Sequence, residues 1–272
     1  MSQLLFELVL PCYNESKNLS NLVQRAAEAA TEGGYSSDQF QLVLVENGSQ
    51  DNSLEVMDKL KKGSYGKWFR VVPVQVNQGY GFGIFSGLQT TQAQFVGWSH
   101  ADQQCDPRDA FKALKIMLEN SDQRILVKGD RQGRDKKDRI VSRIFEFFSN
   151  LILGGQFHEV NAQPKVFNKE FLTQIENPPK GFSFDLYVLY RAMKAGYSFK
   201  TLLVQFPSRI HGASNFSSNL FKRYKTILGA IAYMVKLLYK EGRLSRSLYM
   251  TPLFLMGFFL SFSFYFILDL LI

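Results

Sequence analysis

The fold is decided by residues 4–15, LLFELVLPCYNE, in which an apolar run ends abruptly in a polar turn. Leu4–Leu10 carries a single charge, on Glu7, and its length and composition are typical of a buried β-strand. Apolar residues then recur at helical spacing, at Leu19, Leu22, Val23, Ala26 and Ala30. A strand that leads directly into an amphipathic helix predicts the first half of a β-α-β unit.

The same alternation continues to about residue 130 of the 272-residue chain. Further strands are predicted at Gln41–Val45, Phe69–Val76, Phe95–Ser99 and Ile125–Lys128. Between them, helical spacing recurs at Leu54, Met57 and Leu60 and again at Phe111, Leu114 and Leu118. Strands that alternate with helices predict an α/β fold, with a mostly parallel sheet and helices on both of its faces. In such sheets, ligands bind beyond the carboxyl ends of the strands.

Polar or glycine-rich segments follow four of the predicted strands in succession. These segments are Pro11–Glu15, Glu46–Asp51, Asn77–Gly83 and His100–Gln104. One such segment alone would be an ordinary turn. Four of them at the carboxyl ends of one parallel sheet would converge on a single crevice, so the sequence predicts a ligand site at this edge.

These segments, in this order and spacing, resemble family 2 glycosyltransferases with the GT-A (Rossmann-like) fold, over roughly residues 4–215. Three later segments are most similar to polyprenyl-phosphate glycosyltransferases of the dolichyl-phosphate mannose synthase type: Lys128–Arg131, Gln163–Phe167 and Arg209–Ser214. The resemblance implies a metal-dependent enzyme that moves a sugar from a nucleotide to a polyprenyl (undecaprenyl or dolichyl) phosphate. It also implies inversion at the anomeric carbon.

A UDP- or GDP-linked sugar is the donor that this resemblance implies. Carboxylates can accept hydrogen bonds from ribose or base, Tyr13 can pack against the base, and glycine lets the main chain approach a ligand closely. Family members begin the second motif with Asp, so Glu46 is a longer substitute and the base stays open. The implied donor-binding residues are Pro11, Tyr13, Asn14, Glu15, Glu46, Asn47, Ser49, Asp51, Asn77, Gly79, Gly81 and Asp102.

A divalent cation would neutralise the pyrophosphate leaving group. The resemblance assigns it to the positions of His100, Asp102 and Gln104, where relatives have Asp-x-Asp-x-Gln. Asp102 and Gln104 can ligate Mg²⁺ or Mn²⁺, and an imidazole suits Mn²⁺ better than Mg²⁺. Because the first carboxylate is missing, the metal site is expected to be weak, and His100 can equally be a structural histidine.

The acceptor phosphate is expected to bind to basic and hydroxyl side chains in the later segments, because Arg can bind phosphate oxygens with two nitrogens at once. The implied residues are Arg131, Arg139, Ser142, Lys165, Arg209 and Ser214. The neighbouring Arg134, Lys136 and Lys137 are expected to form a solvated loop. The residues predicted to act in catalysis are Asp102, Asp185, Arg131 and Arg209.

Two other functions stay open. If the acceptor is a hydroxyl of a lipid-linked glycan or of another cell-envelope molecule, Asp185 is the natural general base. With a phosphate acceptor, Asp185 would position the donor sugar or simply stabilise a helix amino terminus. The replacement of a carboxylate by His100 leaves a third reading, a relative that binds ligands without catalysis.

The end of the chain predicts a membrane setting. Residues 247–268 are 22 consecutive uncharged residues, which form roughly 33 Å of helix, about the thickness of the bilayer hydrocarbon. We expect a transmembrane helix at 247–272, a basic amphipathic interfacial helix within 216–246 and a catalytic domain at 1–215. A buried terminal helix and an ordinary surface helix are the alternatives.

Charge predicts the orientation and the partners. The basic residues just before the span, among them Arg243 and Arg246, favour a single-pass membrane protein with a cytoplasmic catalytic domain. Two cysteines, Cys12 and Cys105, suit a reducing compartment. The net charge of +8 fits anionic lipid or a phosphate-bearing substrate better than nucleic acid, because the basic residues cluster beside the span. The oligomeric state stays open, a homo-oligomer included.

Overall fold

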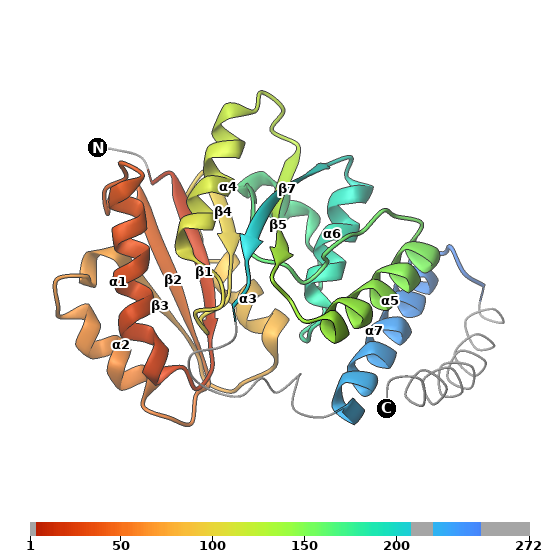
Figure 1. Cartoon of the computed structure of the whole chain (residues 1–272), viewed down its shortest axis with the longest axis horizontal. Helices are drawn as coiled ribbons and strands as arrows, with labels where there is room; N and C mark the ends of the chain where they lie inside the picture. Colours follow the sequence, from red (N-terminus) through yellow and green to blue (C-terminus); the bar gives the residue numbers. More distant parts are fainter. Residues whose placement is uncertain (1–3, 208–219, 246–272) are drawn as a thin grey trace. The chain divides into compact units, whose positions relative to one another are not determined.

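The computed structural model describes residues 4–207 and 220–245 (Figure 1). These residues fall into two compact units, one with residues 4–142 and 158–207, the other with residues 143–157 and 220–245. The strands are β1 (Phe6–Cys12), β2 (Phe40–Asn47), β3 (Phe69–Val74), β4 (Phe95–Trp98), β5 (Ile125–Gln132), β6 (Lys165–Asn168) and β7 (Ser198–Gln205). The α-helices are α1 (Ser16–Glu32), α2 (Ser53–Lys61), α3 (Tyr80–Leu88), α4 (Pro107–Glu119), α5 (Lys136–Leu153), α6 (Phe184–Lys194) and α7 (Leu220–Lys240), with short 3₁₀ turns η1 (Gly66–Trp68) and η2 (Lys169–Gln174).

The strands form one sheet in the order β3-β2-β1-β4-β6-β5-β7. Every neighbouring pair is parallel except the two pairs that involve β6, which runs antiparallel to β4 and β5. The prediction of a mostly parallel α/β sheet is therefore confirmed. The antiparallel strand was not predicted, because four residues are too few to show a period.

Helices cover both faces of the sheet, and side-chain alternation along β1 decides which residues each face receives. Phe6, Leu8 and Leu10 belong to the core under α1 and α4, where Phe111 lies edge-on to Phe6 with ring centroids 5.9 Å apart. Val9 points to the other face, under α3. A Cβ on Gly87 would lie 2.5 Å from a Val9 methyl, so this glycine lets α3 lie close on the sheet.

The antiparallel direction of β6 determines where Lys165 lies in the sheet. In the strand register, Lys165 pairs with Trp98 of β4 and with Lys128 of β5. Because β6 runs in the opposite direction, its first residue lies level with Trp98, the last residue of β4, and with the middle of β5. Lys165 is thereby brought to the edge where ligands bind in open α/β sheets.

The predicted amphipathic segment forms helix α7, in the smaller unit. Its apolar residues Ile231, Met234, Val235 and Leu238 are buried, whereas Lys236 and Lys240 are exposed. In the part of the chain that the structure describes, none of the helices has the length and hydropathy to cross a bilayer. The predicted span at 247–268 lies outside the described residues, and its interfacial neighbour at 216–246 stays a prediction.

The amino-terminal end of the sheet contains a buried carboxylate. Glu7 is 1% exposed and accepts hydrogen bonds from Arg70 Nη2 at 2.7 Å and Nε at 3.1 Å. It also accepts from the backbone N–H of Gln92 and, at 2.9 Å, of Ala93. A buried charge is tolerated when its oxygens are paired in this way. Glu7, the one charged residue in the apolar strand β1, thereby joins β1 to β3 and to the segment before β4.

We predict that Glu7→Gln lowers the free energy of unfolding by about 3 kcal/mol, because the neutral amide removes the charge that pairs with Arg70 and has one oxygen fewer to accept from Arg70 and from the backbone N–H groups of Gln92 and Ala93. Urea unfolding followed by circular dichroism measures this loss. Glu55→Gln is the matched control, since Glu55 is an exposed residue that pairs with Lys59 on α2. Equal unfolding midpoints for the two variants would contradict the role given to Glu7.

Candidate active site

The segments after β1 and β2 are joined by hydrogen bonds. Asn14, with a left-handed φ of 58°, donates its N–H to Ser49 Oγ at 3.1 Å and accepts from the Gln50 N–H at 2.8 Å. The Glu15 N–H donates to Ser53 Oγ at 2.9 Å. The prediction that these two motifs converge is therefore confirmed. Pro11 and Tyr13, both half-buried, lie at the start of this loop pair.

Carboxylates fix the shape of these loops. Glu46, 8% exposed, accepts from the N–H groups of Ser49 at 2.7 Å and Gly48 at 3.3 Å. Asp51 accepts from the Ser16 N–H at 3.1 Å and from both the N–H and Oγ of Ser53. Burial raises the pKa of Asp51, but these hydrogen bonds outweigh it, so the pKa lies below its usual value. Both carboxylates shape the predicted nucleotide loop before any ligand arrives.

The glycine motif after β3 packs against another segment of the protein. We expected Gly79 to let the main chain approach the donor, but a Cβ there would lie 2.5 Å from Lys180 O. A Cβ on Gly81 would lie 2.4 Å from Pro179 O. The missing side chains leave room for the protein's own segment before α6, which the sequence did not predict, and the approach of the main chain to the donor stays a prediction. Asn77 Oδ1 accepts from the Gly79 N–H, and Asn47 Nδ2 donates to Gly79 O at 3.3 Å.

A buried polar cluster lies behind these loops. Lys165, 0% exposed, donates from Nζ to Asp185 Oδ1 at 2.5 Å and to Ala162 O at 2.9 Å. Gln163 Nε2 donates to Asp185 Oδ1 at 2.9 Å and to the Tyr80 hydroxyl at 3.1 Å. Burial raises the pKa of Tyr80, and the charge of Asp185 raises it further. Asp185, 2% exposed, is thus held by a cation and an amide inside the protein.

The loop after β4 is anchored at two points. Gln103, with a φ of 63°, donates from Nε2 to Asn18 Oδ1 at 3.1 Å on α1. Gln104 Nε2 donates to Pro207 O at 2.8 Å, beyond β7. Between them, Asp102 is 4% exposed and its Oδ1 accepts from the Gln104 N–H at 3.1 Å. The loop that carries Asp102 is therefore held from both sides of the sheet.

The fit of a divalent metal depends on His100, Asp102 and Gln104. Burial lowers the pKa of His100 more than the charges of Asp102 and Asp185 raise it, so the imidazole is neutral and can act as a ligand. No cluster of three or more His, Cys, Asp and Glu side chains placed to hold a metal occurs in the described residues. One carboxylate, an amide oxygen and an imidazole fit a divalent cation whose coordination substrate phosphates and water would complete, and the imidazole favours Mn²⁺ over Mg²⁺.

Two arginines after β5 share one carboxylate. Glu159 accepts from Arg131 Nε at 2.5 Å and from Arg134 Nη1 at 3.0 Å, and all three side chains are 9–10% exposed. Arg134 Nη2 also donates to Ser142 Oγ at 2.9 Å and to Asp138 O at 3.2 Å. Our expectation that Arg134 lies in a solvated loop is therefore wrong, because its charge is enclosed within this cluster.

Residues 7–176 match glycosyl transferase family 2. The chain belongs to this family. Among curated relatives, this family 2 chain is 24% identical over 241 residues to the dodecaprenyl-phosphate galacturonate synthase of Rhizobium johnstonii, covering 86% of the chain and 67% of the relative. It is 22% identical over 222 residues to the polyprenol monophosphomannose synthase of Mycolicibacterium smegmatis, covering 78% and 81%.

Solved structures share the fold of this glycosyltransferase. Mannosyl-3-phosphoglycerate synthase from Rubrobacter xylanophilus superposes with a TM-score of 0.68 at 17% identity, covering 89% of the chain and 77% of that structure. Glucosyl-3-phosphoglycerate synthase from Mycobacterium tuberculosis, in complex with Mn²⁺, UDP and glucosyl-3-phosphoglycerate, gives 0.62 at 15% identity, covering 89% and 81%. At these identities the likeness establishes the fold alone.

The remaining residues predicted to bind the acceptor phosphate lie in different environments. Arg139 is exposed on α5, and Ser142 Oγ accepts from Arg134. Lys165 is enclosed with Asp185, so the structure does not present its ammonium group at the surface. Arg209 and Ser214 lie outside the described residues. Glu159, Tyr80 and Lys128 were not predicted as site residues, although Tyr80 and Lys128 lie within the quoted motifs Asn77–Gly83 and Lys128–Arg131.

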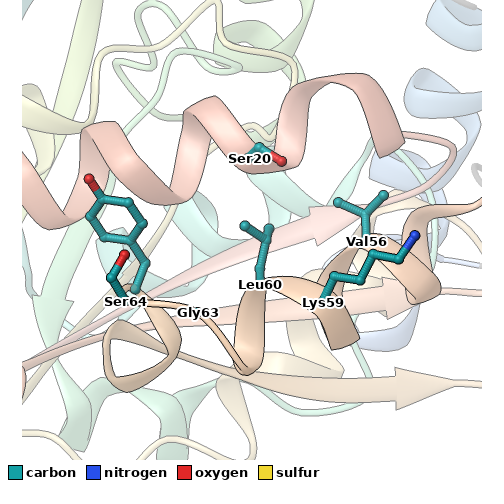
Figure 2. A pocket seen from close by; sticks show the side chains of 7 residues that line it. Ser20, Val56, Lys59, Leu60, Gly63 and Ser64 are labelled. Atoms are coloured by element: carbon teal, nitrogen blue, oxygen red, sulfur yellow. The ribbon is translucent and has the colours of Figure 1, made fainter.

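A shallow pocket of about 320 Å³ lies between α1 and α2 of the glycosyltransferase (Figure 2). Its lining residues are Ser20, Val56, Lys59, Leu60, Gly63, Ser64 and Tyr65. None of the predicted site residues lines it. We therefore place the candidate site at the strand ends, where the polar clusters lie, and not in this pocket.

We predict that Gly79→Ala destabilises the glycosyltransferase by about 1–3 kcal/mol, because φ is +118° and the new Cβ would meet Lys180 O. Gly181→Ala is the matched control, since no atom lies within 4 Å of its added Cβ. Thermal unfolding of both variants checks the prediction. A Gly79→Ala protein as stable as the control would show that the segment before α6 does not rest on this glycine.

Proposed function

We propose that this protein is an inverting glycosyltransferase that moves a sugar from a UDP- or GDP-linked donor to a polyprenyl phosphate. The observation that carries the proposal is the guanidinium of Arg131. Its Nε donates a hydrogen bond to Glu159. Among the described residues its two terminal nitrogens have no hydrogen-bond partner, and neither nitrogen is both unpaired and sealed from solvent. A nearly buried guanidinium with two available donors suits a phosphate monoester.

The environment of Asp185 favours the same acceptor class. A general base must reach the proton that it removes, but Asp185 is 2% exposed and is held by Lys165 and Gln163. A polyprenyl phosphate is already an anion near neutral pH and needs no such base. The curated relatives named above, which act on dodecaprenyl and polyprenol phosphates by their names, support this choice.

The reaction would proceed by attack of a phosphate oxygen on the anomeric carbon. The new C–O bond forms as the bond from that carbon to the nucleoside diphosphate breaks, which inverts the configuration. His100, Asp102 and Gln104 would hold Mg²⁺ or Mn²⁺, which supplies charge neutralisation to the departing diphosphate. Arg131 would hold the acceptor phosphate, and the loops around Asn14 and Ser49 would hold the nucleoside.

The proposal includes a place for the reaction, the cytoplasmic face of a membrane. It rests on the uncharged residues 247–268 and on the basic residues that precede them. Alkaline carbonate extraction of the full chain tests the span, and release into the soluble fraction would contradict it. Labelling of a cysteine introduced at Ser64, in an otherwise cysteine-free chain, tests the orientation from either side of sealed vesicles.

The acceptor and donor are tested together in membranes that contain the full chain. We expect a labelled sugar from one member of a panel of UDP- and GDP-sugars to become lipid-extractable when polyprenyl phosphate is added, and to be released by mild acid. An acid-stable product would point to a glycan hydroxyl as the acceptor. Binding of a nucleotide sugar without transfer from any donor would instead favour a non-catalytic relative.

We predict that Asp102→Ala abolishes transfer while the dissociation constant of the free nucleoside changes little, because Asp102 would act on the diphosphate and the metal. Turnover with saturating Mn²⁺ or Mg²⁺ and calorimetric titration with uridine and guanosine measure the two effects. Asp58→Ala, at an exposed position of α2, is the control. Near-normal turnover of Asp102→Ala with either metal would remove this residue from the site.

We predict opposite outcomes at Arg131 and Asp185. Arg131→Ala should lower acceptor-dependent turnover by roughly 10- to 150-fold, since it removes a charge-assisted contact worth about 1.5–3 kcal/mol. Asp185→Asn destabilises the protein because Lys165 loses its buried partner, so its activity is expressed per folded molecule, measured by circular dichroism; on that scale it should retain substantial activity, because an anionic acceptor needs no deprotonation. Rates are compared at saturating donor, with the exposed Arg124→Ala as control. Inactive Asp185→Asn beside an active Arg131→Ala would favour the hydroxyl acceptor.

A further inference from the structure

Glu159 occupies an unexpected position for an acid. It lies between the two guanidinium groups at the place where the sequence predicts that an anionic substrate binds. It is 7% exposed and adopts a left-handed φ of 43°, which is uncommon for a residue other than glycine. Its backbone O accepts from Lys128 Nζ at 3.2 Å. The backbone and the side chain of Glu159 are therefore both anchored by cations.

The two arginines use their donors differently. Arg134 gives Nη1 to Glu159 and Nη2 to Ser142 Oγ and Asp138 O, so both of its terminal nitrogens serve the protein. Arg131 gives only Nε to Glu159, and its guanidinium carbon lies 5.3 Å from the centre of the Phe206 ring. The contacts with Glu159 and Phe206 restrict the plane of the Arg131 guanidinium but leave its terminal edge available.

We propose that Glu159 is a positioning residue for acceptor binding. Its carboxylate, itself fixed by Arg134, holds Arg131 through Nε and so directs the terminal edge of that guanidinium toward the acceptor phosphate. The inference rests on the proposed function and extends it to two residues, Glu159 and Arg134, for which the sequence analysis predicts no part in the reaction.

The hydrogen bond between Glu159 and Arg131 shows which of two roles Glu159 has: a residue that positions Arg131, or an anion that occupies the position of the acceptor phosphate. A carboxylate that merely filled the phosphate position would be expected to take the terminal nitrogens of Arg131, the edge that binds oxyanions with two parallel hydrogen bonds. Glu159 takes Nε instead. The Glu159 carboxylate also stays ionised. Burial raises the pKa of Glu159, but the positive charges of Arg131, Arg134 and Lys128 lower that pKa by more, so the net shift is downward.

The test uses the full chain in membranes, with polyprenyl phosphate as the varied substrate and donor saturating. We expect Glu159→Gln to lower kcat/KM for the acceptor roughly 10-fold, the scale of one charge-assisted hydrogen bond, with an unchanged dissociation constant for the donor nucleotide. The exposed Glu119→Gln on α4 is the matched control. An unchanged or increased kcat/KM would overturn the inference, since an increase is what removal of a competing anion would give.

A double-mutant cycle separates positioning from general destabilisation. Once Arg131→Ala has been introduced, Glu159→Gln should have little further effect on kcat/KM, because the residue that it positions is gone. Additive effects would overturn the inference. Arg134→Gln provides a second variant if Glu159→Gln no longer binds nucleotide, and its kcat/KM should fall in the same direction, with Arg124→Gln as control.

The outcomes for the two proposals can be told apart. A wild-type protein that transfers no sugar to polyprenyl phosphate overturns the proposed function and this inference with it. An active wild-type protein whose Glu159→Gln and Arg134→Gln variants match their controls overturns only the inference.

Discussion

The buried ion pair between Lys165 and Asp185 is the constraint that joins β6, α6 and the start of α3 behind the loops of the site. Both side chains are almost completely enclosed, and removing one partner of such a pair typically costs about 3–5 kcal/mol, because the other charge is left unpaired in a medium of low polarity. The pair joins the first residue of β6 to the first turn of α6. Through Gln163 it also orients Tyr80, at the start of α3.

Two kinds of contact hold the two halves of the site. The loops after β1 and β2 are held mainly by hydrogen bonds between side chains and backbone N–H groups, as at Asn14 and Asp51. The region after β5 is held mainly by charge, around Glu159. Short hydrogen bonds to the backbone are insensitive to ionic strength, whereas contacts between charges weaken as salt screens them. The enclosure of the Glu159 cluster limits that screening.

Sequence reasoning identified the elements that repeat a clear period. The strands that became β1 to β5 are apolar runs between turn residues, and their parallel arrangement follows from the helices between them. The polar segments after them were correctly expected to meet, since parallel strands end at one edge. β6 was missed, although Gln163–Phe167 had been noticed, because its direction is decided by pairing with β4 and β5 and not by its own composition.

Other errors share a physical cause, because a side chain's role depends on neighbours that are distant in sequence. The packing of Gly79 and Gly81 was not predicted, because the atoms that an added Cβ would meet first belong to residues 180 and 179. Arg134 looked solvated in a run of charged residues, and its burial follows from Glu159, 25 positions later. A charged or glycine-rich segment read alone does not reveal whether its partner is water, substrate or another part of the chain.

The two ends of β1 have different roles, one in stability and one in the candidate site. Glu7 secures the amino-terminal end of the strand, whereas the residues from Pro11 to Glu15 serve the other end; Glu7 and Cys12 lie roughly 17 Å apart at the rise of an extended strand. Substitutions farther apart than about 7–10 Å usually act independently. Substitutions at the amino-terminal edge of the sheet could therefore raise the stability of the protein without changing its catalytic site. The same separation would let thermal stability evolve while substrate specificity stayed constant.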